Sequence, residues 1–286
     1  MTLSEQTKQS RLYARAFGRG VYSDILRWGD SETLTHLCLL ESHDPEETYH
    51  DCIRRFYGAM KRNYRCEYVF KNEIIANLKK EYAGQQTLIV NEFRVGNSIA
   101  DLAFFNGESR AYEIKTAYDS PRRLVGQMDD YRKLFDECYL VVEEGELHTW
   151  KPYAEGGLGL MLVCHGPKGK IKLEKYKDSS RQESIDVDVL MTCLRAEEYE
   201  HIAEAYAGTV LSKQKDLHYK ECKDILKQMD EVALHTAFLE TIEQRKSSFD
   251  LLKRTPKELF QVCMSMHLTE TQLETIILSL NNKVNG

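Results

Sequence analysis

The sequence predicts an α/β fold in which a mixed central sheet carries helical N-terminal and C-terminal additions. Residues 86–115 contain three short segments rich in β-branched and aromatic side chains, separated by the turn signals "GN" and "NGE". Helical patterns precede these segments, and another helix and an apolar strand follow them. The order helix, three strands, helix, strand predicts a mixed sheet with helices packed against it.

Two helices are expected before the strands. In "HDPEETYHDCIRRFYGAM", Asp44 is predicted as N-cap, with Pro45 in the first turn and Glu47 at the capping-box position. The segment "EYVFKNEIIANLKKEYAG" predicts a second amphipathic helix, with Gly84 beyond its end. Its apolar side carries Val69, Ile74, Ile75 and Leu78.

After the third strand, a helix is expected from Ser120, with Pro121 in its first turn. One face of this helix carries Leu124, Met128, Tyr131 and Phe135, and "CYLVV" follows as an apolar strand. The segments "ELHTWK", "GLMLVC" and "KIKLEKYK" are further strand candidates that would extend the sheet.

Residues from about 184 to the end show helical patterns again. Thr255 and Thr269 each begin a predicted capping box. We therefore expect a helical region at 1–66, a core at 67–183 and a helical region at 184–286. The C-terminal helices form either a separate subdomain or an appendage.

Composition limits the class of protein. Apolar residues make up 42% and charged residues 29% of the 286 residues, as in ordinary globular proteins. No apolar run approaches the roughly 20 residues that span a membrane, and the N-terminus lacks the apolar segment of a secretory signal. The eight cysteines are scattered without a C-x-x-C pair, which favours free thiols in a reducing cytoplasm. We expect a cytoplasmic protein without a membrane partner.

The strand "RAYEIK" contains the chemistry-bearing residues. Residues two apart in a strand share a face, so Glu113 and Lys115 point the same way. If the preceding strand pairs with this one as an antiparallel hairpin, Asp101 joins them. Two neighbouring carboxylates need a positive charge between them, and Mg²⁺ accepts such oxygen ligands. The alternative is an exposed cross-strand charge pair.

The hairpin loop decides whether Asp101 and Glu113 share a face. A two-residue Asn106-Gly107 turn would place Asp101 on the opposite face, because one residue of slip inverts every side chain. A metal site requires an odd-length loop or a bulge. A loop of Phe105, Asn106 and Gly107 would place Asp101 opposite Ala111 and diagonal to Glu113.

The next helix carries polar residues near the same place. Gln127 and Tyr131 are four residues apart and share a helical face. A polar Gln on a buried face needs a partner, and an active site beneath the helix would provide one. Arg122 and Arg123 lie in the first turn, against the dipole preference, and are suited to meet a phosphate; a solvated arginine pair is the alternative.

In this order, Glu73, Asp101, "EIK" and "QMDDY" resemble the PD-(D/E)XK nuclease superfamily, most closely its RecB-like branch and a group of stand-alone bacterial proteins. The resemblance covers residues 68–142 and implies a restriction-endonuclease-like core with helix, three strands, helix and strand. It implies metal ligation by Asp101, Glu113 and the Ile114 carbonyl. Ala100 stands where proline is common in the superfamily.

The resemblance also implies roles for the remaining residues. Lys115 would position or activate water, and Gln127 and Tyr131 would contact substrate or brace the site. Glu73 would be a supporting carboxylate and metal ligand, although Glu92 in the first strand competes for that role.

Two basic stretches are candidates for binding nucleic acid. Residues 54–65 hold five basic and three aromatic side chains, and residues 168–177 place lysines along one strand face. The candidates in the first stretch are Arg54, Arg55, Lys61 and Arg62. Solvated surface is the alternative for both stretches. The net charge of −6 leaves room for a local basic groove on an acidic body.

These features predict a nuclease dependent on Mg²⁺ or Mn²⁺ that hydrolyses nucleic acid, with DNA favoured over RNA as its substrate, in restriction, repair or phage defence. Endonuclease and exonuclease action both stay open, as does a homodimer or a partner protein bound through the C-terminal helices. The alternatives are a non-catalytic nucleic-acid-binding or adaptor subunit and a helical interaction protein with an α/β core. Intact Asp101, Glu113 and Lys115 favour the enzyme.

Overall fold

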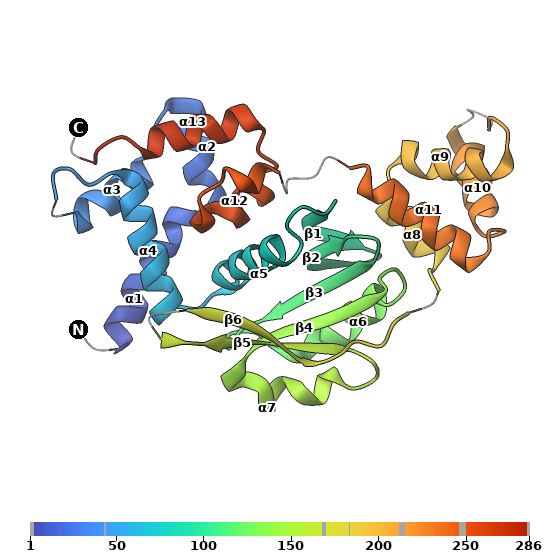
Figure 1. Cartoon of the computed structure of the whole chain (residues 1–286), viewed down its shortest axis with the longest axis horizontal. Helices are drawn as coiled ribbons and strands as arrows, with labels where there is room; N and C mark the ends of the chain where they lie inside the picture. Colours follow the sequence, from blue (N-terminus) through green and yellow to red (C-terminus); the bar gives the residue numbers. More distant parts are fainter. Residues whose placement is uncertain are drawn as a thin grey trace. The chain divides into compact units, whose positions relative to one another are not determined.

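The structure is a computed structural model that describes residues 3–42, 44–167, 170–182, 184–211, 215–245 and 250–284. The chain forms two compact units (Figure 1). The first unit contains Met1–Ala83, Val163–Leu173 and Ser248–Gly286, and the second contains Gly84–Leu162 and Glu174–Ser247. The predicted domains followed chain order, and that division stays a prediction. Lys168, in the second predicted basic stretch, lies outside the described residues.

Apart from Val163–Leu173, the first unit is mainly helical. Its N-terminal part contains α1 (Leu3–Tyr13), α2 (Arg19–Trp28), α3 (Glu32–Glu41), α4 (Tyr49–Asn63) and α5 (Glu67–Glu81), and its C-terminal part contains α12 (Phe260–Ser265) and α13 (Glu270–Leu280). Asn72 of α5 joins the two parts, because its side chain donates to the Lys257 carbonyl and accepts from the Gln261 amide. The apolar side predicted for α5 is confirmed, since Val69, Ile74, Ile75 and Leu78 are buried.

The start predicted for the helix at Asp44 is wrong. Helix α4 begins at Tyr49, with Thr48 as N-cap and Asp51 completing the capping box. The Asp44 side chain instead accepts a hydrogen bond from the Glu46 amide and forms a local turn. The helix begins after Thr48 because the Thr48 hydroxyl accepts from the Asp51 amide and the Asp51 carboxylate accepts from the Thr48 amide. One aspartate cannot satisfy both amides alone.

A six-stranded mixed sheet lies in strand order β1-β2-β3-β4-β5-β6. The strands are β1 (Leu88–Val95), β2 (Ser98–Phe105), β3 (Ser109–Lys115), β4 (Glu137–Glu143), β5 (Gly159–His165) and β6 (Ile171–Lys177). The first three pair antiparallel, and β3 pairs parallel with β4 after the crossover through α6 (Leu124–Tyr131). The fold is therefore α/β with helical flanks, and the predicted order from α5 to β4 is confirmed.

Two local predictions fail. "ELHTWK" is not a strand but contains α7 (Leu147–Trp150), where the buried Trp150 lies three residues after Leu147, a helical spacing. Thr255 is not an N-cap, because its hydroxyl donates backwards to the Leu251 carbonyl. The capping box at Thr269 is confirmed at the start of α13.

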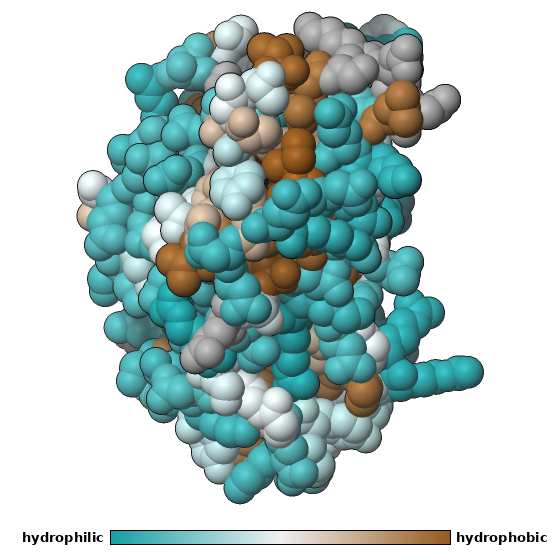
Figure 2. All heavy atoms as spheres, turned by 90° about the vertical axis from the view of Figure 1, so that its right-hand side faces the viewer, coloured by the Kyte–Doolittle hydropathy of each residue, from teal (hydrophilic) through white to brown (hydrophobic). Residues whose placement is uncertain are grey.

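Four further helices complete the second unit: α8 (Val187–Cys193), α9 (Ala196–Ala207), α10 (Lys215–Leu226) and α11 (Glu231–Glu243). Arg245, just after α11, ties them together by pairing with Glu198 and donating to the Cys193 carbonyl. Figure 2 shows the side of the molecule on which Figure 1 labels these helices, and apolar side chains lie there among polar ones. Among the described residues, no helix combines the length and the apolar character needed to cross a membrane.

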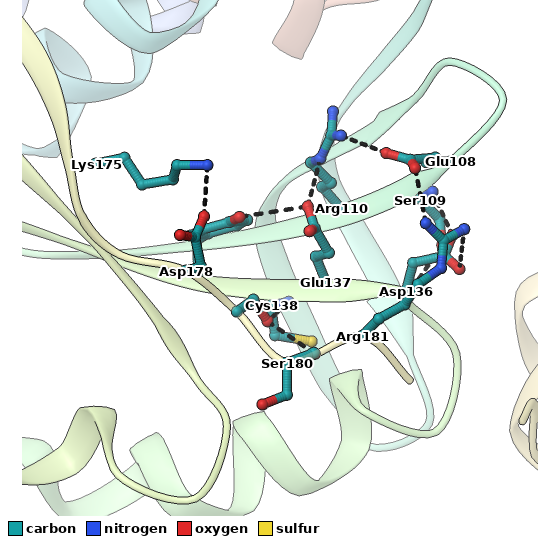
Figure 3. A network of polar contacts seen from close by, with 12 residues as sticks. Glu108, Ser109, Arg110, Asp136, Glu137, Cys138, Lys175, Asp178, Ser180 and Arg181 are labelled. Carbon is teal, nitrogen blue, oxygen red and sulfur yellow. Dashed lines mark hydrogen bonds and ion pairs between the residues drawn. The ribbon is translucent and has the colours of Figure 1, made fainter. Parts of the chain in front are cut away.

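Polar side chains fasten the beginnings of β3 and β4 (Figure 3). The Asp136 carboxylate accepts from the Ser109 amide at 2.7 Å and from its hydroxyl at 2.9 Å. The Asp136 amide donates back to the Ser109 hydroxyl at 2.9 Å. On the neighbouring position Arg110 donates to Glu137 at 2.7 Å. These contacts fix where β3 starts relative to β4, and thereby the register of the whole strand.

An aromatic core in the second unit packs against β1 and β2. Phe105 lies at 5.8 Å from Phe135 and 6.0 Å from Phe238, measured between ring centroids. Phe93 of β1 meets Phe105 at 5.5 Å. Phe105 and Phe135 are completely buried, so this cluster anchors the C-terminal end of β2 and the chain after α6.

We predict that Gly159→Ala destabilises the protein. A methyl group at this position would lie 2.4 Å from the Tyr139 ring and 2.9 Å from the Ser179 amide nitrogen. Overpacking of this kind lowers the free energy of unfolding by about 1–3 kcal/mol. Urea unfolding followed by circular dichroism measures the change. Gly145→Ala is the matched control, because no heavy atom lies within 4 Å of its added carbon. Equal stability of both variants would contradict the close approach.

Candidate active site

The loop between β2 and β3 has odd length, as the metal-site prediction requires. Phe105 pairs with Ser109, and Asn106, Gly107 and Glu108 form the connection. The Asn106 amide donates to the Glu108 carbonyl at 3.0 Å, and Gly107 takes the left-handed conformation with φ of 64°. The parity prediction is therefore confirmed.

The particular loop predicted, from Phe105 to Gly107, is wrong. Ala103 and not Asp101 lies opposite Ala111. Phe105 stays in the strand because its buried ring belongs to the aromatic core. Continuing the observed register by one residue places Asp101 directly opposite Glu113, on the same face of the sheet.

The Glu113 carboxylate is the centre of the candidate site. It is only 3% exposed and both of its oxygens accept hydrogen bonds. Oε1 accepts from Lys115 Nζ at 2.6 Å and from Gln127 Nε2 at 2.7 Å. Oε2 lies 2.8 Å from the Tyr131 hydroxyl. Lys115 Nζ also donates to Gln127 Oε1 at 3.3 Å, so the amide is oriented by both charged groups.

Tyr131 braces the site from the end of α6. Its hydroxyl oxygen lies 2.6 Å from the Ile99 carbonyl as well as 2.8 Å from Glu113. A hydroxyl carries one proton, so the two acceptors share it. Burial raises the pKa of Tyr131 well above its usual value, and the negative charges of Glu113 and Asp101 raise it further. The phenol is therefore a hydrogen-bond donor and not a base.

Asp101 is half-buried at the edge of this cluster. Its Oδ2 accepts from the Ile114 backbone amide at 2.7 Å. This contact holds the carboxylate against β3. The register places Asp101 opposite Glu113, on the same face of the sheet. Two carboxylates and a lysine thus gather as the sequence predicts, while the Ile114 amide was missed because backbone groups leave no sequence signal.

The two candidates for a third carboxylate lie in different surroundings. Glu73 belongs to α5 in the first unit, where it pairs with Lys61 at 2.8 Å and accepts from the Tyr57 hydroxyl at 2.8 Å. Glu92 is exposed in β1. Asn91 pairs with Leu102 and Phe93 with Ala100, so the register places Glu92 opposite Asp101.

The backbone at Glu92 is unusual. It has φ of 57°, a left-handed conformation that costs a residue other than glycine about 1–3 kcal/mol. The strained residue therefore lies beside the carboxylate that the metal prediction depends on.

The basic residues predicted to bind nucleic acid differ in exposure. Arg55 contacts Glu47 at 2.9 Å and Lys61 contacts Glu73, so both are engaged within the first unit. Arg54 and Arg62 are exposed on α4. The aromatic side chains Phe56 and Tyr57 of the same stretch are buried and cannot stack on bases, which corrects that part of the prediction. The cause is the helix, which turns these rings into the core.

Arg122 and Arg123 are both exposed just before α6, in the same unit as Glu113. They occupy a short 3₁₀ turn, Pro121–Arg123. The next helical residue, Leu124, is buried, and it fixes the turn against the fold. The pair therefore presents its two positive charges to solvent, as phosphate binding requires.

The donor set fits a hard divalent cation. Asp101 and Glu113 offer carboxylate oxygens on facing positions of neighbouring strands. The described residues contain no group of three or more His, Cys, Asp or Glu side chains placed to hold a metal ion. Mg²⁺ commonly uses one or two carboxylates and completes its shell with water and substrate phosphate, so two ligands are enough for it.

Residues 60–263, more than half of the sequence, match the family model described as Bacteriophage P4 protein cII. The chain belongs to the bacteriophage P4 protein cII family. The matched residues include the candidate site from Glu73 to Tyr131. Curated proteins gave no match. A solved structure of a protein of unknown function from Silicibacter pomeroyi is similar at 13% identity, with a TM-score of 0.32, covering 47% of this chain and 87% of that one.

We predict that Tyr131→Phe destabilises the protein at neutral pH by about 1.5–3 kcal/mol, the value of a hydrogen bond to a charged group. Because the pKa of Tyr131 is raised in the folded state, only the unfolded state ionises this phenol as pH rises above about 10. This ionisation stabilises the unfolded wild type and so lowers its free energy of unfolding, whereas the variant has no phenol to ionise. The difference in unfolding free energy, measured by urea unfolding, should shrink from pH 7 to pH 11. A constant difference would contradict the raised pKa.

Proposed function

We propose that this protein is a metal-dependent nuclease of the PD-(D/E)XK type that hydrolyses phosphodiester bonds, with DNA as the favoured substrate. The observation that carries the proposal is the gathering of Asp101, Glu113 and Lys115 on one face of a β-hairpin, with Gln127 and Tyr131 of the following helix bonded to Glu113. The succession α5, β1, β2, β3, α6 and β4 supports the same assignment.

Asp101 and Glu113 would hold Mg²⁺ or Mn²⁺, with the Ile114 carbonyl beside them and Glu92 as the better placed third carboxylate. The bound ion would lower the pKa of a water molecule and withdraw charge from the scissile phosphate. The hydrogen bonds around Glu113 serve to aim its carboxylate. Orienting partners of this kind typically change metal affinity or activity by 10- to 100-fold.

Lys115 is placed to act on water. It is 8% exposed, and its ammonium group shares Glu113 and Gln127 as acceptors. One of its three protons remains available to a water molecule or a phosphate oxygen. Gln127 keeps the ammonium and the carboxylate in fixed positions. Tyr131 contributes a neutral donor throughout the working pH range.

Two observations bear on where the proposed nuclease acts. The matched family is described as a bacteriophage protein, and the role included in the proposal is restriction, repair or phage defence in the cytoplasm. Free thiols on all eight cysteines agree with a reducing compartment. A homodimer or a partner protein bound through the C-terminal helices remains part of the proposal.

We predict that purified protein cleaves DNA with Mg²⁺ or Mn²⁺ and is inactive in EDTA. Asp101→Asn, Glu113→Gln and Lys115→Ala should each reduce the cleavage rate by about 100-fold or more, since they remove metal ligands or a proton-transfer group. Plasmid and oligonucleotide cleavage measured on gels gives the rates.

Asp129→Asn is the matched control, because Asp129 is an exposed carboxylate on the same helix as Gln127. Near-ultraviolet circular dichroism checks that each variant is folded, which matters most for Lys115→Ala because it leaves a buried carboxylate without its cation. Full activity in EDTA, or wild-type rates in all three folded variants, would refute the nuclease. Binding of DNA without cleavage would point to the adaptor alternative.

We further predict that Arg122→Ala and Arg123→Ala together weaken binding to DNA of any sequence. A plot of log affinity against log salt concentration has a negative slope. Each lost phosphate contact should make this slope shallower by about one. Fluorescence anisotropy at 50–200 mM salt in EDTA measures the slope. The double variant Lys220→Ala/Lys227→Ala, on and after α10, has the same charge change and should leave the slope unchanged. An unaltered slope in the arginine variant would show that the pair is only solvated surface.

A further inference from the structure

The segment that follows the candidate site is exposed but held in shape. Residues 117–120 are all exposed, directly after the buried Lys115 and Thr116. The Asp119 carboxylate accepts from the Thr116 amide at 2.8 Å and from its hydroxyl at 2.7 Å. The Asp119 amide donates to the Thr116 carbonyl at 3.1 Å, and the Tyr118 amide donates to the Thr116 hydroxyl at 3.2 Å. Thr116 and Asp119 therefore close a compact turn, and Tyr118 is one of the residues between them.

This turn presents an aromatic ring to solvent. Tyr118 is 62% exposed, whereas most aromatic residues of the strands and of α6 are buried. Exposing a large ring forgoes the free energy that its burial would contribute. The hydrogen bonds at Thr116 restrict the backbone on either side of Tyr118, so a ligand that binds the ring need not immobilise the loop first.

The chain limits how far this ring lies from the chemistry. Tyr118 is three residues after Lys115, so their Cα atoms are at most about 10 Å apart. A ligand held at Lys115 can therefore reach Tyr118 with a neighbouring group. Arg122 and Arg123 follow within five residues and are exposed as well. An exposed ring and two exposed guanidinium groups thus follow Lys115 within eight residues of the chain, a combination suited to a base beside phosphates.

We propose that Tyr118 stacks on a base of unpaired DNA next to the scissile phosphate, so that the substrate of this site is single-stranded DNA. The inference rests on the proposed nuclease function for its meaning, but stacking itself needs neither metal nor cleavage. In a duplex each base is already stacked between its neighbours and paired, so an exposed tyrosine cannot use its face. Single strands offer every base to such a ring, with little dependence on sequence.

The test compares binding of the full chain to a fluorescein-labelled 20-nucleotide single strand and to the duplex of the same sequence, by anisotropy in EDTA. Wild type should bind the single strand more tightly. Tyr118→Ala should weaken single-strand binding by about 5-fold or more, the usual effect of losing one stacked base, and leave duplex binding within 2-fold. Tyr118→Phe keeps the ring and should bind like wild type.

Tyr206→Ala is the control, because Tyr206 is 50% exposed on α9 in the same unit. It should change neither affinity. Unchanged single-strand binding in Tyr118→Ala, an equal loss on duplex, a loss of the same size in Tyr118→Phe, or no single-strand binding by wild type would each overturn the inference. Because no metal is present, these outcomes are independent of cleavage. Cleavage with Mg²⁺ by a Tyr118→Ala variant that binds normally would leave the nuclease standing and remove only the stacking role.

Discussion

The arrangement of the candidate site depends on a carboxylate that is almost fully removed from water. Moving an ionised side chain from water into the protein interior costs several kcal/mol of solvation free energy, and only close hydrogen-bonding or charged partners offset that cost. Glu113 obtains an ammonium, an amide and a phenol, each within 2.8 Å. These partners come from β3 itself and from α6, so the strand and the helix can pack in few other ways. The burial of Glu113 therefore fixes the position of the helix as well as the chemistry of the strand.

A second constraint is the parity of the hairpin that carries Asp101. A β-strand alternates faces at every residue, so one residue more or less in the loop would separate the two carboxylates by the thickness of the sheet. The loop Asn106-Gly107-Glu108 has three residues because contacts fix the strand residues at both of its ends. Phe105 cannot leave the strand without opening the aromatic core, and Ser109 is fastened to Asp136. Contacts at the far end of β3 thus set the geometry at Glu113.

The part of α6 that faces the sheet shows how polar and apolar residues share one helix. Leu124, Met128 and Tyr131 are buried, and Gln127 lies at the boundary where it can reach both Glu113 and Lys115. The exposed turn before the helix carries the arginines and Tyr118. The same short stretch of chain therefore contributes packing on one side and a surface open to ligands on the other. This division is what makes the region a candidate for substrate binding.

Local patterns were enough to predict most helices and strands, but they also assigned Glu73 to the candidate site, and Glu73 lies in the first unit paired with Lys61. Segments rich in β-branched and aromatic residues predicted β1, β2 and β3, and the spacing of Leu124, Met128 and Tyr131 predicted α6. Phe135 was expected on the same helix but lies after its end at Tyr131. Gln127 was expected to find a partner in a site beneath the helix, and it contacts Glu113 and Lys115. One error arose where two local signals competed. Asp44 and Thr48 both satisfy the rules for an N-cap, and only the completed box at Thr48 and Asp51 decides between them.

The sequence by itself determined the succession of helices and strands and the residues that carry charge in the site, because these depend on side-chain chemistry and on periods of two and 3.6 residues. Only the tertiary structure decided the hairpin register, the engagement of Lys61 by Glu73 and the burial of Phe56 and Tyr57. The reason is that a register is chosen by packing between distant residues. Phe105 meets Phe238 from a helix more than 100 positions later, and no local pattern contains that contact.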